Sequence, residues 1–245
     1  MGLETGITWC DSTWNPFVGC IKVGEGCKNC YMYREQTRYG ADPTVIRRTK
    51  PRTFNSPLRW KEPKVIFVCS WSDFFLKEVD RWRDDAWKII KEANQHTYLL
   101  LTKRAERIKN CLPADWNNVD YGHVWLGVTS ENRAEYANRE LMLASLNMSL
   151  KLEKRTFISF EPLLEDIRIG MNTEIDNVIM TNLGWAIVGG ESGGKVAREM
   201  DSEWARKIKR ECAKHDIPFF FKQMTNHAPI PDDLSLSNQK PRMGK

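Results

Sequence analysis

The chain has 245 residues, of which 41% are hydrophobic and 28% are charged, and its formal net charge is +5. This composition is typical of a folded globular protein and excludes a mostly disordered one. No apolar stretch approaches the ~20 residues of a membrane-spanning helix, and Met1–Thr5 lacks the basic and apolar regions of a signal peptide, so we expect a cytoplasmic protein without membrane contact.

Short apolar runs alternate with amphipathic segments along the chain. The first strand is predicted at Ile7–Trp9 or Phe17–Gly19. Six further runs are uniformly apolar, as is typical of parallel strands covered on both faces: Val65–Cys69, Thr97–Leu101, Val124–Val128, Thr156–Phe160, Trp185–Val188 and Pro218–Phe221. Asp80 is predicted to cap a helix that runs to about Asn94, and Asp201 to cap another.

This alternation predicts the α/β class, with a mostly parallel sheet curled into a full or partial (β/α) barrel over residues 1–223. Two segments do not fit the repeat. A Pro- and Arg-rich insertion at about 40–64 and a polar tail at 224–245 are both predicted to be loops.

Polar residues follow each predicted strand. They are Ser70, Ser72 and Asp73; Thr102 and Lys103; Thr129, Glu131 and Asn132; Glu161; Gly189, Gly190 and Glu191; and Lys222 and Gln223. Because parallel α/β folds bind ligands at the carboxyl ends of their strands, we expect these six clusters to converge on one site.

Three of the seven cysteines, Cys20, Cys27 and Cys30, form a C-x6-C-x2-C motif. In a reducing compartment such crowding favours a metal or cluster site over disulfides. Three thiolates on a [4Fe-4S] cluster leave one iron without a protein ligand, and an open iron can chelate S-adenosylmethionine (SAM) for reductive cleavage to a 5'-deoxyadenosyl radical. The alternative is structural zinc, with Cys10 or a distant histidine as fourth ligand.

The remaining cysteines have different surroundings. Cys69, Cys111 and Cys212 stand among apolar or helical neighbours and are predicted to be small buried hydrophobes. The role of Cys10 stays open.

The chain resembles the radical SAM superfamily, and most closely the phage and bacterial three-cysteine-motif proteins with the pattern TWNP-x2-GC-x6-C-x2-CY. The stretches that carry the resemblance reach to Gln223: Thr13–Pro16, Phe67–Phe75, Thr102–Arg104, Val124–Asn132, Phe160–Leu164, Val188–Gly193 and Pro218–Gln223. Two features depart from the superfamily pattern. Asn29 replaces the frequent aromatic residue before the last cysteine, and Ser70, Ser72 and Asp73 stand where Gly-Gly-Glu is common.

The resemblance implies a radical SAM barrel, a [4Fe-4S] cluster, SAM, and an external electron donor such as flavodoxin or ferredoxin. It implies SAM contacts from the residues named after the strands: Ser70, Ser72, Asp73, Thr102, Thr129, Glu131, Asn132, Gly189, Gly190 and Gln223. Lys103, Glu161, Glu191 and Lys222 are candidates for catalytic groups, for contacts to the SAM carboxylate or the substrate, or for structural ion pairs.

The positive charge is concentrated between Thr44 and Lys64, a segment that contains seven basic residues and one acidic residue, Glu62. Nucleic-acid contacts are predicted for Arg47, Arg48, Lys50, Arg52, Arg59, Trp60 and Lys61, since cations neutralise phosphates and aromatic rings stack on bases. A solvated cationic loop is the alternative.

Similar phage proteins suggest a modified base, such as hypermodified thymidine in phage DNA, as substrate and isomerisation as a possible reaction; a duplex base would have to flip out. RNA, a peptide or a metabolite stay open as substrates, as does a zinc-stabilised nucleic-acid-binding module without catalysis. The oligomeric state is not predicted.

Overall fold

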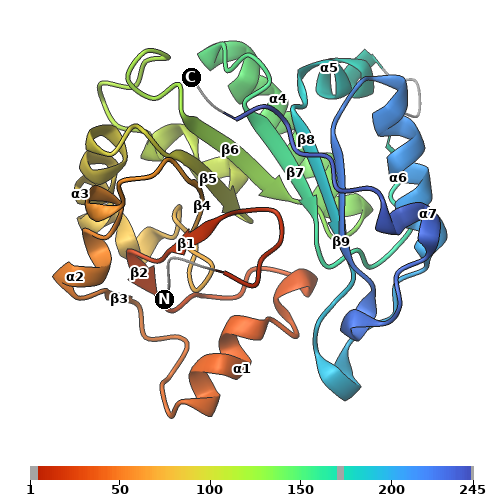
Figure 1. Ribbon diagram of the computed structural model, residues 1–245, viewed down its shortest axis with the longest axis horizontal. Coiled ribbons are helices and arrows are strands. Elements are labelled where there is room, and N and C mark those ends of the chain that lie inside the picture. The colour runs from red at the N-terminus through yellow and green to blue at the C-terminus, as the bar shows by residue number, and fades with distance from the viewer. Residues whose placement is uncertain (1–4, 170–173, 244–245) are drawn as a thin grey trace. The chain divides into compact units, whose positions relative to one another are not determined.

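The computed structural model describes residues 5–169 and 174–243 (Figure 1). The chain divides into two compact units. The N-terminal unit comprises the chain up to Lys22, Met32–Leu126 and the end of the chain from Met243. The C-terminal unit comprises Val23–Tyr31 and Gly127–Arg242. Met1–Glu4, part of the segment examined for a signal peptide, and the last two residues of the predicted tail lie outside the described residues.

The N-terminal unit contains the first strands of the main sheet. β1 (Ser12–Trp14) pairs in parallel with β4 (Val65–Val68), which pairs in parallel with β5 (Thr97–Thr102). β6 (Val124–Thr129) follows, and the boundary between the units falls within it. The predictions at 65–69, 97–101 and 124–128 are therefore confirmed.

The prediction for the first strand was wrong. The first strand is Ser12–Trp14, which begins with two polar residues although Ser12 is fully buried. Phe17–Val18 forms β2, a two-residue strand that pairs antiparallel with β3 (Arg47–Arg48) in a separate small sheet.

The basic insertion is not a structureless loop. Besides β3 it contains α2 (Pro51–Phe54) and a 3₁₀ turn, Pro57–Arg59. Phe54 is 1% exposed and packs edge-on against Trp14, whose indole Nε1 donates to the Phe54 carbonyl at 2.9 Å. One buried aromatic residue thus anchors the insertion, a long-range contact that its Pro- and Arg-rich composition conceals.

The other helices of the N-terminal unit are α1 (Tyr31–Arg38) and α3 (Asp80–Glu92). Asp80 is the first residue of α3 and not its cap, because the preceding turn Lys77–Val79 runs directly into the helix. Further 3₁₀ turns span Ala105–Arg107 and Lys109–Cys111.

The C-terminal unit continues the β/α alternation. β7 (Thr156–Phe160) pairs in parallel with β8 (Trp185–Gly189), and β8 with β9 (Phe219–Gln223), as predicted. The helices are α4 (Arg133–Leu150), α5 (Glu174–Asn182), α6 (Ser202–Lys214) and α7 (Asp232–Ser235). Asp201 caps α6 as predicted, accepting the Glu203 N–H at 2.8 Å.

The polar tail packs on this unit. Its elements are a 3₁₀ turn, Thr225–His227, and α7. The Phe221 N–H donates to the Ser237 carbonyl at 2.7 Å, and the Trp185 indole Nε1 to the Gln239 carbonyl at 3.0 Å. The tail therefore supplies hydrogen-bond partners beside β9 and is ordered in the residues described.

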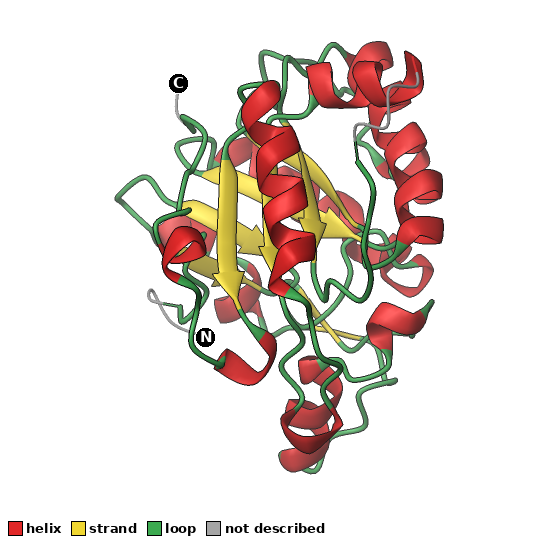
Figure 2. Ribbon diagram, turned by 90° about the vertical axis from the view of Figure 1, so that its right-hand side faces the viewer, coloured by secondary structure: helices red, strands yellow, loops and turns green. Residues whose placement is uncertain are grey.

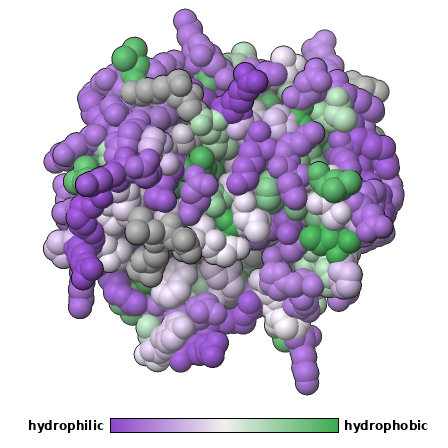
Figure 3. Space-filling view, viewed as in Figure 1, coloured by the Kyte–Doolittle hydropathy of each residue, from purple (hydrophilic) through white to green (hydrophobic). Residues whose placement is uncertain are grey.

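The strand order of the main sheet is β1-β4-β5-β6-β7-β8-β9, and helices or turns connect the strands (Figure 2). The α/β class with a mostly parallel sheet is confirmed. Hydrophilic side chains dominate the face drawn in Figure 3, as expected when the strands hold the apolar residues. None of the helices in the described residues is both long and apolar enough to span a bilayer.

Candidate metal centre and its supporting residues

Cys20 follows β2 in the N-terminal unit, and backbone bonds fix the residues around it. The Cys20 N–H donates to the Pro43 carbonyl at 2.9 Å, and the Tyr33 hydroxyl donates to the Cys20 carbonyl at 2.5 Å. Gly19 has φ +94°, and a Cβ there would lie 2.4 Å from the Val45 carbonyl oxygen, so only glycine fits before this cysteine.

The loop after β4 holds the same segment. The Ser72 hydroxyl donates to the Gly19 carbonyl at 2.7 Å, and the Gly19 N–H donates to the Trp71 carbonyl at 3.0 Å. Ser70 instead exchanges hydrogen bonds with the Asn15 side chain. Two of the predicted SAM contacts, Ser70 and Ser72, therefore support the loops around Cys20.

Asp73 is buried and joins the ends of β4 and β5. Its carboxylate accepts the Thr102 hydroxyl at 2.8 and 2.9 Å, the Lys103 N–H at 3.3 Å and the Arg104 guanidinium at 2.9 Å. The structure thus brings together Asp73, Thr102 and Lys103, which belong to two of the six predicted clusters. The same contacts make Asp73 an anchor between strand ends.

Arg104 was not among the predicted site residues. It is 7% exposed, and its second arm donates from Nη2 to the carbonyl of Ile21, the residue after Cys20, at 2.7 Å. Burial alone would lower the pKa of Arg104, but the Asp73 carboxylate and the Cys20 thiolate outweigh it and raise that pKa. The only sequence signal was its place after β5 in the Thr102–Arg104 stretch.

Cys27 and Cys30 lie in the C-terminal unit, where they form a knuckle: Cys27 ends the 3₁₀ turn Glu25–Cys27 and Cys30 precedes α1. The Cys27 N–H donates to the Gly24 carbonyl at 2.9 Å. Asn29, between the cysteines, donates from Nδ2 to Glu191 at 2.9 Å and to the Val196 carbonyl at 2.8 Å. The loop after β8 therefore holds the knuckle through Asn29.

Glu191 and Arg198 complete this attachment. The Glu191 carboxylate accepts from the Arg198 N–H at 2.9 Å and from its guanidinium, and the Arg198 guanidinium also donates to the Glu25 carbonyl at 3.0 Å. Burial raises the pKa of Glu191, but the hydrogen bonds from Arg198 and Asn29 outweigh it and lower that pKa. Glu191 thus forms a structural ion pair, one of the roles considered for it.

The end of β6 also lies close to the knuckle loop. A Cβ on Gly26 would lie 2.4 Å from the Glu131 carboxylate, which accepts from Thr129 at 3.0 Å and from Arg139 at 2.8 Å. Asn132 caps α4 by accepting the N–H of Glu135. A hydrogen bond therefore joins Thr129 and Glu131, two residues of the same predicted cluster, at the end of β6.

The remaining strand-end residues form a third group in the C-terminal unit. Lys222 pairs with Glu161 at 2.7 Å, and a Cβ on Gly189 would lie 2.7 Å from that carboxylate. Gln223 donates from Nε2 to the Gly190 carbonyl at 2.9 Å. Glu161 and Lys222 are thus joined in an ion pair and partly exposed, at 15% and 26% of their side chains.

Several residues of the predicted nucleic-acid surface have partners within the protein. Arg48 pairs with Asp85 at 2.9 Å and stacks on Phe54, and Arg47 donates to Gln36 at 2.9 Å. The Arg59 guanidinium donates to the carbonyls of Arg52 and Asn55, and the Trp60 ring packs edge-on against the His96 ring. Lys50, Arg52 and Lys61 are exposed, and among the described residues their side chains have no partner.

No disulfide forms among the seven cysteines, all of which lie in the described residues. Cys69, Cys111 and Cys212 are buried as predicted, and Cys10 is buried as well. Burial raises the pKa of all three predicted hydrophobes, that of Cys212 to about 12, which makes them poor thiolate ligands.

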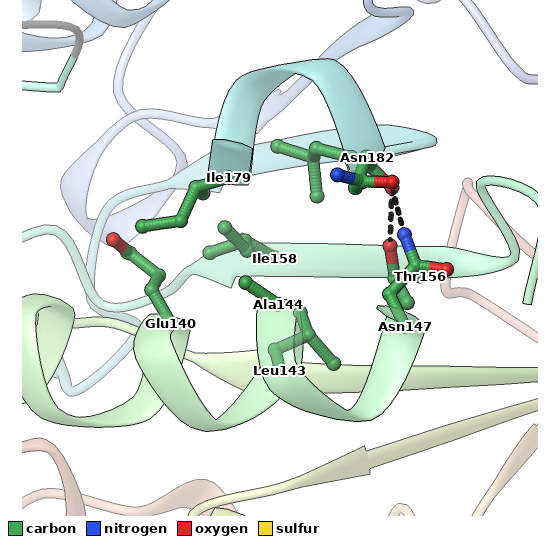
Figure 4. Close-up of a pocket in the computed structure, with 9 residues that line it drawn as sticks. Glu140, Leu143, Ala144, Asn147, Thr156, Ile158, Ile179 and Asn182 are labelled. Carbon is green, nitrogen blue, oxygen red and sulfur yellow. Dashed lines mark hydrogen bonds between the residues drawn. The ribbon is translucent and has the colours of Figure 1, made fainter. Parts of the chain in front are cut away.

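The cavity in Figure 4 is not the predicted site. It lies between α4, β7 and α5, and apolar side chains such as Leu143 and Ile158 line most of it. At one end Asn147 and Thr156 both donate to the Asn182 carbonyl at 2.9 Å. Thr156 begins β7, so the cavity reaches the end of the strand opposite to the predicted ligand-binding edge.

The donor set suits an iron–sulfur cluster by its chemistry, because three thiols outside any disulfide lie in loops with fixed backbones. Within the described ranges, no three His, Cys, Asp or Glu side chains are assembled so that they could hold a metal ion. The cysteines therefore suit a cluster by their chemical identity and by the support of their backbones, and not by the arrangement of their three side chains.

Comparison with known proteins identifies a family but no activity. No curated protein and no solved structure matches the chain. Residues 4–243, nearly the whole chain, match the family described as "Protein of unknown function (DUF5131)". The chain therefore belongs to the DUF5131 family.

Proposed function

We propose that this protein is a radical SAM enzyme in which Cys20, Cys27 and Cys30 hold a [4Fe-4S] cluster within a partial (β/α) barrel. One observation supports the proposal: in each unit, polar residues that follow the strands contact residues next to the cysteines of that unit. In the N-terminal unit these are Ser72 and Arg104. In the C-terminal unit they are Glu131 and Glu191.

When bound, such a cluster supplies the electron that cleaves SAM into methionine and a 5'-deoxyadenosyl radical. The chain's own residues hold the ligands in place. Asp73 and Arg104 fix the segment after Cys20, while Asn29, Glu191 and Arg198 fix the knuckle. Thr129, Asn132, Gly189 and Gly190 are among the ten proposed SAM contacts, and the pair Glu161–Lys222 is a proposed contact to SAM or substrate.

The proposed substrate is a nucleobase or its appended group, for example hypermodified thymidine in phage DNA, and the reaction an isomerisation. The exposed cations Lys50, Arg52 and Lys61 support this choice, because unpaired surface cations are free to neutralise phosphates. An external electron donor, such as flavodoxin or ferredoxin, would supply the electron. RNA, peptide and metabolite substrates are the rivals.

The cluster is tested first. Protein purified without oxygen should contain about four irons and four sulfides per chain, with a matching brown absorbance. Replacing Cys20, Cys27 or Cys30 by Ala should abolish this content, whereas the buried Cys111→Ala should retain it. Stoichiometric zinc without sulfide, lost on Cys10→Ala, would instead identify a zinc-stabilised module.

The reaction is tested next. The reduced enzyme should convert SAM to 5'-deoxyadenosine, and modified phage DNA should accelerate the conversion relative to SAM alone. RNA and peptide preparations serve as parallel samples. Acceleration by one of these and not by DNA would reassign the substrate, and a loaded cluster that leaves SAM intact would refute the enzymatic proposal.

A further inference from the structure

Arg104 connects a buried carboxylate to the cysteine segment. Its side chain is 8% exposed and that of Asp73 is 7% exposed. The Nη1 arm donates to Asp73 at 2.9 Å and the Nη2 arm to the Ile21 carbonyl at 2.7 Å. The Arg104 N–H also donates to the Thr102 hydroxyl at 2.9 Å, which fixes the start of the side chain.

The Cys20 thiol contacts the same oxygen. Its Sγ lies 3.6 Å from the Ile21 carbonyl oxygen, so the sulfur and the guanidinium share one acceptor. The Cys20 thiolate also contributes to the raised pKa of Arg104. A guanidinium stays protonated at every working pH, so this cation is a permanent neighbour of the sulfur.

A fixed positive charge beside a redox centre stabilises the state that carries the extra electron. The effect is larger when the charge is buried, because little water screens it. Charge and hydrogen bonding around the ligand sulfurs are among the factors that set iron–sulfur potentials. Asp73 acts in the opposite direction, since its negative charge disfavours reduction.

We propose that Arg104 is a positioning residue for Cys20 that also raises the reduction potential of the bound cluster, with Asp73 as its opposing charge. The inference rests on the proposed function, because it requires a cluster at Cys20. It goes further in assigning redox control to the pair Asp73–Arg104, which lies outside the cysteine motif.

The test compares redox titrations of anaerobically purified variants, followed by electron paramagnetic resonance of the reduced cluster. Arg104→Gln should lower the ratio of reduced to oxidised cluster at a fixed potential about tenfold, which corresponds to 59 mV for one electron. Asp73→Asn should raise the ratio. Arg104→Lys keeps the positive charge but cannot donate to Asp73 and Ile21 through two arms. Its reduction potential should therefore be closer to that of wild type than the potential of Arg104→Gln is, while it loses iron during purification.

The control is Arg107→Gln. Arg107 belongs to the same loop and pairs with Asp80 at 2.7 Å, without contact to Ile21. Its loss should leave the potential unchanged. Opposite shifts in the Arg104 and Asp73 variants cannot arise from general loosening of the loop.

Three outcomes decide the matter. A loaded wild type whose potential is unchanged by Arg104→Gln overturns the inference and leaves the proposed function intact. A wild type without iron and sulfide overturns the proposed function itself. If Arg104→Gln does not retain a cluster, Asp73→Asn decides, and a potential at or below that of wild type overturns the inference.

Discussion

Two residues of the knuckle loop show how closely its surroundings fit it. Gly26 leaves no room for a side chain: beyond its missing Cβ, the nearest atoms belong to Glu131, which is 1% exposed and held by Arg139. Asn29 fills the space beside Glu191 with two hydrogen bonds. Both residues would act on the proposed ligands through backbone position and not through direct contact with a metal.

Gly26→Ala should destabilise the protein by about 1–3 kcal/mol, because the new methyl group overpacks against a carboxylate that is already fixed. Urea unfolding of the metal-free protein measures the change. Gly6→Ala is the control, since a Cβ there meets no atom within 4 Å, and it should stay within about 0.5 kcal/mol of wild type. Equal stability of the two variants would contradict the close fit at Gly26.

Asn29→Ala should lower the iron content after anaerobic purification and reduce the free energy of unfolding by about 1–2 kcal/mol, since two hydrogen bonds are lost and partners are left unsatisfied. The control, Asn117→Ala, removes exposed hydrogen bonds to Asp115 and Asp120 in a loop without motif cysteines. Iron content equal to wild type in Asn29→Ala would show that the knuckle does not need this attachment.

At the scale of elements, ion pairs join helices to the loops that follow strands. Asp80, in the first turn of α3, accepts from Arg107 of the turn after β5 and from Arg83 one helical turn onward. Burial would raise the pKa of Asp80, but the hydrogen bonds from these two arginines outweigh it and lower that pKa. The carboxylate therefore favours the folded state while it is ionised.

Asp80→Asn should cost about 0.5–1 kcal/mol at pH 7, since the pair is half-exposed and screened by solvent. Because the pKa of Asp80 is lower in the folded state than its unfolded value of about 3.9, its ion pairs contribute their full stability at pH values above about 3.9. It is lost as the pH falls through the folded pKa, so variant and wild type should converge in acid. Urea unfolding at neutral and acid pH measures this, with Asp84→Asn on the same helix as an unchanged control.

For the whole molecule, the distribution of charge matters more than its net value. The segment Thr44–Lys64 of the N-terminal unit, with seven basic residues and one acidic residue, accounts for the whole net positive charge, but Arg47, Arg48 and Arg59 already have partners inside the protein. Nucleic-acid binding should therefore depend chiefly on the exposed residues Lys50, Arg52 and Lys61.

Replacing Lys50, Arg52 and Lys61 together by Ala should weaken DNA binding and reduce the slope of log affinity against log salt by about 0.9 per lost phosphate contact. Fluorescence anisotropy over a salt series measures both. The control replaces Arg210 and Lys214 of α6, which are exposed but paired with Glu203 and Glu211. A slope unchanged in the triple variant would remove this segment from the nucleic-acid interface.

The sequence alone determined the α/β class, six of the seven strands of the main sheet, the cap of α6 and the burial of Cys69, Cys111 and Cys212. These features follow from local apolar runs and capping residues, which burial imposes on neighbouring positions. The proposed cluster ligands also came from the sequence, through their spacing and the resemblance to radical SAM proteins, and they remain a prediction.

Only the tertiary structure decided what surrounds those ligands. β1 was missed because its buried Ser12 carries no apolar signal. Asn29 meets Glu191 across 162 positions of sequence and Arg104 meets Ile21 across 83, and no local pattern records such a partner. Whether a charged side chain faces solvent, a nucleic acid or another side chain depends on what the fold brings beside it, which is why Arg104 and the paired arginines of the insertion could be assigned only in three dimensions.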